Sequence, residues 1–375
     1  MKTRMLSALC IILCALTGCV SSQRTFLYTT GPGTSEIFAF EAHTNGSITP
    51  LGTPNFSAGS GPAALAIHPP GDFIYIADTA GSTVTLLQIN KGNGELTVPP
   101  TNSALPPVTP PNIFNTGNGP VALVVAPNAP HVYVLNQAGG NISAFLLDPS
   151  NGNLALITNP PGNGAGSIST YANGSFTAPS AMAISPQGDF LFVASPSQHS
   201  ISVLPVNSND GSLGTASQLV VSPAATPTGL AVHPSGKFLY ATDAANNTVL
   251  AFSIQNGALT PVAGSPFAAG TQPAGITTDP GGAELFVANS GSNDVSAYVI
   301  DANSGAIAPV AGSPFATGGR GPNFVAATGA FVYVGDQTTN DLAAFSIGNG
   351  GALAPVPGSP FSVATSPAWI AMTVE

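Results

Sequence analysis

Few side chains in this sequence could act as an acid, a base or a catalytic cation. Of the five histidines, only His199 falls in a predicted hairpin on the side of the molecule from which the long loops also emerge. Arg320 is one of only six Lys and Arg residues and stands in a glycine-rich segment on that side. Acid–base hydrolysis needs a paired acid and base, and no second histidine accompanies His199. We therefore regard His199 and Arg320 as weak catalytic candidates and leave the catalytic residues unassigned.

Acidic residues recur at the ends of predicted strands. Asp78, Asp243 and Asp336 each close an aromatic strand, and Asn136 and Asn289 take the same position elsewhere. Oxygen ligands suit Ca²⁺, so the three aspartates are weak candidates for a calcium site. Asp and Asn also close tight hairpins by bonding to their own backbone. Because the position recurs so regularly, we favour hairpin closure and expect no cofactor, with calcium as the alternative.

The composition excludes several classes of function. The formal net charge is −10, whereas proteins that bind nucleic acid carry a basic stripe, so we expect no nucleic-acid partner. The chain has no phosphate-binding loop, Gly-x-Ser-x-Gly elbow or His-Glu-x-x-His motif. Only 6% of residues are charged, and the chain contains 43 Gly and 36 Pro. This composition argues against long exposed helices and favours an all-β fold with many turns.

Three kinds of residue recur seven times each, which indicates a repeat protein. A proline precedes an apolar strand, a glycine in a turn precedes another strand, and one residue closes each aromatic strand. The prolines are Pro62, Pro120, Pro179, Pro227, Pro273, Pro322 and Pro367. The glycines are Gly46, Gly94, Gly152, Gly211, Gly257, Gly305 and Gly351. The strand-closing residues are Gly31, Asp78, Asn136, Ser195, Asp243, Asn289 and Asp336.

Each repeat is predicted to form four short strands. In one repeat the first three strands cover about 63–67, 73–77 and 84–89, and Asn93-Gly94 predicts a tight hairpin into the fourth. Units of four strands at a period near 46–48 residues predict the blades of a β-propeller.

The two ends of the chain predict how the ring closes. The repeats begin with a second strand near Phe26 and end after a first strand at about 368–374. The last strand can therefore complete the first blade and remove both sheet edges. We predict an all-β, seven-bladed β-propeller with four-stranded blades over residues 26–375, closed by the C-terminal strand joining the N-terminal blade, and we expect a monomer.

Two long inserts predict the ligand-binding surface. The segments 99–119 and 158–178 lengthen two connections between a fourth strand and the next first strand. Long loops on a rigid scaffold commonly carry binding residues. Aromatic rings beside amides suit a neutral, polar ligand. The predicted ligand-binding residues are Phe114, Asn115, Tyr171, Asn173, Gln272, Arg320 and Asn323.

The N-terminal residues resemble a bacterial lipoprotein signal. Lys2 and Arg4 precede an apolar run that is too short to span a membrane, and the run ends in Leu16-Thr17-Gly18-Cys19. The resemblance implies a signal peptide over residues 1–18, a lipid on Cys19 that anchors the protein in the membrane, and a tether over 19–25. Val20 in place of Asp implies the outer membrane of the cell envelope, facing the periplasm or the surface. An ordinary secretory signal is the alternative.

The repeats resemble lactonase-type seven-bladed propellers, including 6-phosphogluconolactonase-like proteins. The stretch Gly-Pro-x-x-Leu-Ala-Ile-His-Pro-x-Gly-Asp-Phe-Ile-Tyr-Ile-Ala-Asp at 61–78 carries this resemblance, and Phe-Val-Ala-Asn289 resembles the YVTN-type repeat of surface proteins. The lactonase members have Gly-Pro-Arg-His before an Asn-Glu pair, whereas this chain has Gly321-Pro322-Asn323-Phe324 and then Asp336-Gln337. The family's catalytic residues therefore have no counterparts here.

These observations favour a binding function over catalysis. We expect a membrane-anchored binding or scaffold module for a neutral glycan, peptide or protein partner, without enzymatic activity. The alternative is a divergent lactonase, a 6-phosphogluconolactonase-like carboxylic ester hydrolase that acts on a sugar lactone or another lactone. Beyond the signal segment the cations are Arg24, Lys91, Lys237 and Arg320, which leaves few partners for a phosphorylated sugar.

Overall fold

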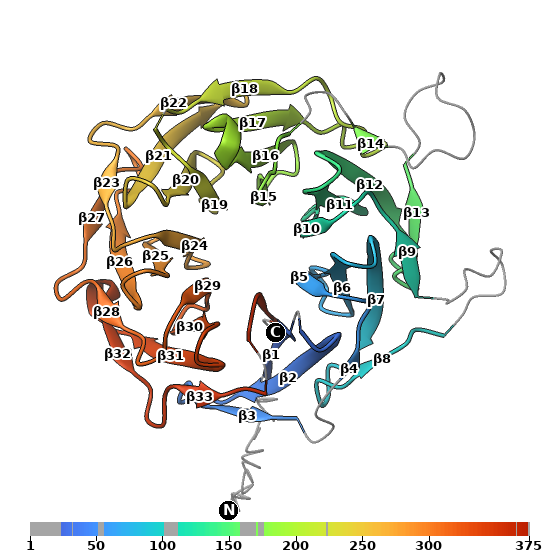
Figure 1. Cartoon of the computed structure of the whole chain (residues 1–375), viewed down its shortest axis with the longest axis horizontal. Coiled ribbons are helices and arrows are strands. Elements are labelled where there is room, and N and C mark those ends of the chain that lie inside the picture. Colours follow the sequence, from blue (N-terminus) through green and yellow to red (C-terminus); the bar gives the residue numbers. More distant parts are fainter. Residues whose placement is uncertain are drawn as a thin grey trace, which may run out of the picture.

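The computed structural model describes residues 24–31, 33–51, 56–100, 112–157, 170–171, 176–222, 224–364 and 366–373. Seven small antiparallel sheets, or blades, stand in a ring around a central channel (Figure 1). The predicted seven-bladed β-propeller is therefore confirmed. Within these ranges, no helix is long and apolar enough to cross a membrane.

Every blade places its strands in order from the channel outward (Figure 1). From blade 1 to blade 7, the innermost strands are β34 (Ile370–Met372), β5 (Pro62–Ile67), β10 (Pro120–Val125), β15 (Ala181–Ile184), β19 (Pro227–Val232), β24 (Pro273–Thr278) and β29 (Pro322–Ala327). The second strands are β1 (Thr25–Gly31), β6 (Phe73–Asp78), β11 (His131–Asn136), β16 (Phe190–Ser195), β20 (Phe238–Asp243), β25 (Glu284–Asn289) and β30 (Phe331–Asp336). The third strands are β2 (Glu36–Ala42), β7 (Thr83–Ile89), β12 (Asn141–Leu147), β17 (Ser200–Pro205), β21 (Thr248–Gln255), β26 (Asp294–Ile300) and β31 (Asp341–Ile347).

The outer edge is divided into two pieces in most blades, where the sequence predicted one strand. The first pieces are β3 (Ile48–Pro50), β8 (Leu96–Thr97), β13 (Leu154–Leu156), β22 (Ala258–Pro261), β27 (Ile307–Pro309) and β32 (Leu353–Pro355). The second pieces are β4 (Phe56–Ser57), β9 (Ile113–Asn115), β14 (Thr170–Tyr171), β23 (Phe267–Ala268), β28 (Phe315–Ala316) and β33 (Phe361–Ser362), and blade 4 has β18 (Ser217–Val220). The described ranges also contain two short 3₁₀ helices, η1 (Pro196–Gln198) and η2 (Asn349–Gly351).

The sequence Ser-Pro-Phe recurs at 265–267, 313–315 and 359–361, and these segments lie at this division of the outer edge. Ser265 follows β22, and its hydroxyl oxygen accepts a hydrogen bond from the backbone N–H of Ala251 at 2.9 Å. Ser313 and Ser359 accept the same bond from the third strands of blades 6 and 7. Each serine therefore satisfies a backbone donor of the third strand where no outer strand pairs with it.

Adjacent blades pack face to face through apolar side chains. The described residues form seven hydrophobic clusters, and each draws on two neighbouring blades. Tyr75 of β6 and Val134 of β11, for example, share one cluster. All six residues of β6 are buried, because one face of the strand meets the preceding blade and the other meets the next.

A tyrosine hydrogen bond crosses five of the seven blade interfaces. The hydroxyl group of Tyr75 donates to the carbonyl oxygen of Gly152 at 2.7 Å, and Gly152 has a φ of +78°. A Cβ at Gly152 would lie 2.8 Å from the Phe73 ring, so glycine meets both the backbone and the packing requirement. The other pairs are Tyr28–Gly94, Tyr133–Gly211, Tyr240–Gly305 and Tyr333–Gly46. The recurring turn glycine therefore receives the aromatic residues of the preceding blade.

The first blade is completed from the far end of the chain, as the sequence predicted. Leu27 and Tyr28 of β1 pair with Met372 and Ala371 of β34. The backbone N–H of Phe26 also donates to the Thr373 hydroxyl at 3.0 Å, across 347 residues of sequence. Blade 1 thus depends on contacts between distant segments.

Candidate functional site

A cavity of about 380 Å³ lies in the channel, among the inner strands of blades 4 to 7 and the residues that precede β34. It is lined by Ser180, Ala181, Met182, Thr228, Gly229, Leu230, Ala274, Gly275, Ile276, Thr277, Asn323, Phe324, Val325, Ala368 and Trp369. A volume in this range is typical of a site for a small molecule.

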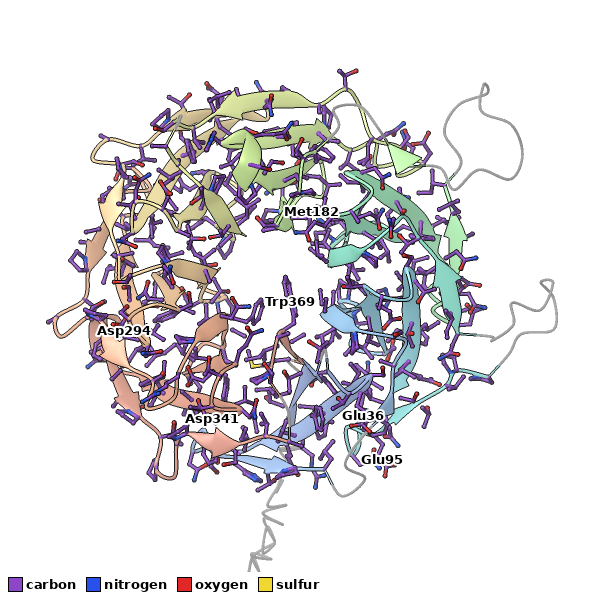
Figure 2. The ribbon with its side chains drawn as sticks, viewed as in Figure 1. Glu36, Glu95, Met182, Asp294, Asp341 and Trp369 are labelled. Atoms are coloured by element: carbon purple, nitrogen blue, oxygen red, sulfur yellow. The ribbon has the colours of Figure 1, made fainter. Side chains whose placement is uncertain are left out.

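One wall of the cavity is aromatic. The rings of Trp369 and Phe324 stack with their centroids 4.4 Å apart and their planes at 29°. Figure 2 shows Trp369 reaching toward the centre of the ring of blades. Trp369 is half-buried and also packs against the hydrophobic clusters of blades 1 to 4. The indole therefore contacts both Phe324 of blade 7 and apolar residues on the other side of the channel, and it also lines the cavity.

The polar groups of the cavity come from the start of the inner strands. The Thr228 hydroxyl lies 2.9 Å from the Thr242 hydroxyl and donates to the Pro273 carbonyl at 3.1 Å. The Ser180 hydroxyl donates to the Pro227 carbonyl at 3.3 Å. In the described part of the chain, no hydrogen bond engages the side-chain amide of Asn323, which is half-buried. This amide is free to donate to and accept from a ligand.

Among the residues that the structure describes, the cavity lining contains no charged side chain. The described lining therefore contains no carboxyl or imidazole group that could act as an acid or a base. The cavity itself can therefore bind and orient a neutral molecule, and any group that activates water must approach from outside the lining.

Of the predicted site residues, the structure brings Asn323 into the cavity. Arg320 precedes it by three residues and is exposed, and its backbone N–H donates to the Thr339 hydroxyl at 2.9 Å. Gln272 is also exposed just before an inner strand, with a φ of 52°. Arg320 and Gln272 thus lie on segments that lead into the cavity-lining strands, outside the lining itself.

The described residues predicted from the first insert, Phe114 and Asn115, lie away from the channel. β9 lies at the outer edge of blade 2 (Figure 1). Phe114 is only 7% exposed and packs in the cluster between blades 2 and 3, whereas Asn115 is exposed. Burial removes Phe114 from the ligand-accessible surface on which we expected it. Tyr171 pairs through its backbone with Ile142, its side chain is outside the described part of the structure, and Asn173 lies outside the described residues.

His199 has a structural partner. It follows η1 with a φ of 52°, and its Nδ1 lies 2.6 Å from the carbonyl oxygen of Ala225. His199 is half-buried and does not line the channel cavity. The structure therefore places the two weak catalytic candidates, His199 and Arg320, in different blades.

The predicted calcium candidates lie in separate blades, each within its own hairpin. The Asp78 carboxylate accepts hydrogen bonds from the hydroxyls of Thr85 at 2.6 Å and Thr83 at 3.3 Å, and burial raises the pKa of Asp78 to about 6. Asp243 accepts from the backbone N–H of Thr226 at 2.9 Å and from the Asn246 amide. In the described ranges, no three His, Cys, Asp or Glu side chains gather as a metal-binding group. A calcium site stays a prediction that these contacts do not address.

The third candidate, Asp336, stands opposite a second carboxyl group. It pairs with Asp341 across the hairpin of β30 and β31, and both side chains are buried. A Cβ on Gly319 would collide with a carboxyl oxygen of each. Burial raises the pKa of Asp336 to about 8, and the Asp341 carboxyl adds to the rise. Figure 2 shows Asp341 away from the centre of the ring, so this pair is separate from the cavity.

Sequence reasoning missed the aromatic wall. In five of the seven inner strands, both positions after the anchor proline hold small or branched residues. The other two strands have Asn323-Phe324 and Ala368-Trp369 at these positions. Trp369 is the only tryptophan of the chain. A large aromatic ring on an inner strand, where most blades have small residues, could have indicated a site in the channel.

Comparison with known proteins gives one family and a set of similar structures. The family model described as "Lactonase, 7-bladed beta-propeller" matches residues 19–230 and 221–321. A candidate 6-phosphogluconolactonase from Bacteroides uniformis is 20% identical, with a TM-score of 0.74 over 94% of this chain and 100% of that one. The periplasmic gluconolactonase of Pseudomonas aeruginosa is 18% identical, with a TM-score of 0.73 over 94% and 99%. No curated protein sequence matches.

Proposed function

The chain belongs to the lactonase family of seven-bladed β-propellers, and on that premise we propose that it hydrolyses the ring ester of a lactone bound in the channel cavity. The family match is the observation that carries this proposal. It also confirms the resemblance found in the repeats.

The expectation of a binding module without enzymatic activity is corrected by the family match, which points to a lactonase. That expectation rested on the missing Arg-His and Glu residues of the family motif. The absence of those residues concerns the means of catalysis, and it does not remove the cavity or the family relationship. The alternative given above, a divergent lactonase, is therefore the better supported function.

The cavity lies where the resemblance places the family's motif. Asn323 and Phe324, which replace the Arg-His pair, both line it. We assign the Asn323 amide to the lactone carbonyl, because its N–H can donate to that oxygen and stabilise the negative charge that develops there. Water adds to the carbonyl carbon, the ring C–O bond breaks, and a proton passes to the ring oxygen, which yields a hydroxy acid.

The proposal can be tested with purified protein and a panel of neutral lactones, namely γ-butyrolactone, δ-valerolactone, γ-decalactone and glucono-δ-lactone. Acid release is followed in a weakly buffered indicator assay against the spontaneous rate. We expect turnover of at least one lactone, and we expect Asn323→Ala to lower kcat/KM by about 100-fold if its amide stabilises the oxyanion.

The matched control is Asn303→Ala, which removes an exposed amide in the turn between β26 and β27. It should leave kcat/KM unchanged. Failure to hydrolyse every lactone of the panel would count against the proposed function. Equal effects of Asn303→Ala and Asn323→Ala would count against the assigned site.

We also propose that the protein is held at the cell envelope by a lipid on Cys19. The signal peptide over residues 1–18 and Cys19 lie outside the described residues, so this proposal rests on the sequence motif. Cys19→Ser should move the protein from the membrane fraction to the soluble fraction. If the variant still sediments with membranes after a high-salt wash, the lipid is not the anchor.

A further inference from the structure

The chemistry of the cavity lining selects among lactones, and this inference rests on the proposed function. Within the described part of the chain, no Asp, Glu, Lys, Arg or His lines the cavity. A phosphate or carboxylate bound there would lose its hydration without gaining a counter-charge, and such burial is strongly unfavourable. The lining therefore disfavours acidic and phosphorylated ligands.

Most polar groups of the lining stand at the start of the inner strands. Ser180, Thr228 and Asn323 lie there, and two residues further on, about 7 Å along the strand, stand Met182, Leu230 and Val325. Thr277 adds one hydroxyl group farther along β24, where it donates to the carbonyl oxygen of Thr278 at 3.2 Å. A ligand that fills the cavity thus meets mainly hydroxyl and amide groups at one end and mainly apolar side chains at the other.

The aromatic wall adds a flat, apolar surface. Trp369 and Phe324 already stack on each other, so their rings are held in place before a ligand arrives. Backbone also comes close at this point, because a Cβ at Gly275 would lie 2.7 Å from the carbonyl oxygen of Asn323. The cavity therefore favours a hydrophobic substituent over a polyhydroxylated ring, whose hydroxyl groups would find few partners there.

We propose that the substrate is a neutral lactone that carries an alkyl or aromatic substituent. Its ring ester lies against Ser180, Thr228 and Asn323, and its substituent packs against Trp369 and Phe324. Sugar lactones and their phosphates are poor ligands of this cavity.

Trp369 allows ligand binding to be measured separately from turnover. Because it is the only tryptophan in the chain, its emission on excitation at a wavelength that tyrosine does not absorb reports on the cavity alone. The probes are γ-decalactone, glucono-δ-lactone and 6-phosphogluconolactone. We expect γ-decalactone to change the Trp369 emission with a saturable dependence, while the two sugar lactones leave it unchanged up to the same concentration. We also expect kcat/KM for γ-decalactone to exceed that for glucono-δ-lactone by at least tenfold.

The two proposals fail in different ways. Turnover that prefers glucono-δ-lactone or its phosphate would overturn this inference and leave the lactonase function intact. Saturable binding of γ-decalactone without hydrolysis of any lactone would support the ligand class and overturn the lactonase function. Absence of any emission change with γ-decalactone would overturn the ligand class.

A pair of variants tests the role of the aromatic wall. Phe324→Leu removes the ring that stacks on Trp369 while keeping an apolar side chain, and it should weaken γ-decalactone binding about three- to tenfold. Phe315→Leu, at the outer edge of blade 6, is the matched control and should not change binding. Thermal unfolding of both variants shows whether the fold is retained, and equal binding by the two variants would contradict the role of Phe324.

Discussion

Blades 6 and 7 each contain a hairpin between their second and third strands, and the two hairpins differ in the polar side chains next to the turn. In blade 6 the side-chain amide of Asn289 donates to the Asp294 carboxylate at 2.7 Å and to the Ser296 hydroxyl at 2.9 Å. Ser296 in turn accepts a hydrogen bond from the backbone N–H of Gly270 at 3.3 Å. One carboxylate therefore faces an amide donor, and a hydroxyl links the cluster to the neighbouring loop.

Blade 7 carries two acids and no hydroxyl at the equivalent strand positions. Asp336 replaces the amide, Asp341 keeps the carboxyl group, and Ala343 replaces the serine. Burial raises the pKa of Asp336 to about 8, and the adjacent Asp341 carboxyl group adds to the rise, because two neighbouring buried carboxyl groups cannot both be charged at low cost. The protein thus holds a proton near neutral pH in one blade at a position where the neighbouring blade needs none.

Blade 2 shows that the partner group matters as well as the burial. Asp78 is as buried as Asp336, but it faces the hydroxyls of Thr83 and Thr85. These donors stabilise its charged form, and its pKa rises only to about 6. The comparison teaches that the hairpin tolerates an acid when its two partner positions supply donors.

The largest effect is expected when the blade 7 arrangement is copied into blade 6. Asn289→Asp would place a second carboxyl group against Asp294 and remove two donated hydrogen bonds. We expect the free energy of unfolding at pH 8 to fall by about 3 kcal/mol, measured by urea denaturation. The loss should be smaller at pH 5, because a raised pKa lets the folded state keep a proton there. The same loss at both pH values would contradict the carboxyl-pair explanation.

The reverse change should stabilise the protein. Asp336→Asn recreates the amide–carboxylate pair of blade 6 and should raise the free energy of unfolding at pH 8 by about 2 kcal/mol. A carboxyl group whose folded pKa is raised stabilises fully below its unfolded pKa near 3.8, and this contribution is lost as the pH rises toward 8. Because Asp336→Asn removes this carboxyl group, the free energy of unfolding of the variant should fall less between pH 4 and 8 than that of the unmodified protein. Asp78→Asn serves as a comparison, with its pH effect confined below about 6. An unchanged pH profile in Asp336→Asn would show that the pair holds no proton.

The smallest effect is expected from restoring the missing hydroxyl. Ala343→Ser adds the group that Ser296 supplies in blade 6, placed to donate to Asp336 and to accept from the loop at Gly319. We expect about 1 kcal/mol of added stability at neutral pH and a lower pKa for Asp336, seen by following its carboxyl resonance by NMR. Ser296→Ala should have the opposite effect on stability. A pKa that does not move in Ala343→Ser would show that the hydroxyl does not reach Asp336.

Much of the fold could be predicted from the sequence, because the same pattern of residues occurs seven times, once for each blade. The recurring prolines, turn glycines and strand-closing residues each mark one position in every blade. The number of blades and the completion of blade 1 could therefore be predicted by counting these residues. The contact that explains the recurring turn glycine could not be predicted in the same way. Gly152 accepts a hydrogen bond from Tyr75 of another blade, and the distance between these two residues depends on how the blades pack against each other.

The candidate site was less predictable, because its residues converge on one axis from several blades. Asn323 was identified from its motif position and lies in the cavity. Phe324 and Trp369 are 45 residues apart and occupy the same position after their anchor prolines, but the repeat does not show that their rings stack. Phe114 was misplaced because a long insert suggested an exposed loop, whereas the insert contains a strand, β9, that buries this ring. Composition alone does not separate a loop residue from an edge-strand residue.

The pairing of β1 with β34 has a consequence for biosynthesis. β1 is synthesised before every other described strand, and its inner neighbour emerges after all of them. Until then, blade 1 presents an open strand edge and an unfilled apolar face, while blades 2 to 7 can form as their segments are completed. Such an edge can pair with another chain. We therefore expect that the nascent protein is most prone to aggregation before its last described strand is released, and that chaperones which cover exposed strand edges act on it at this stage.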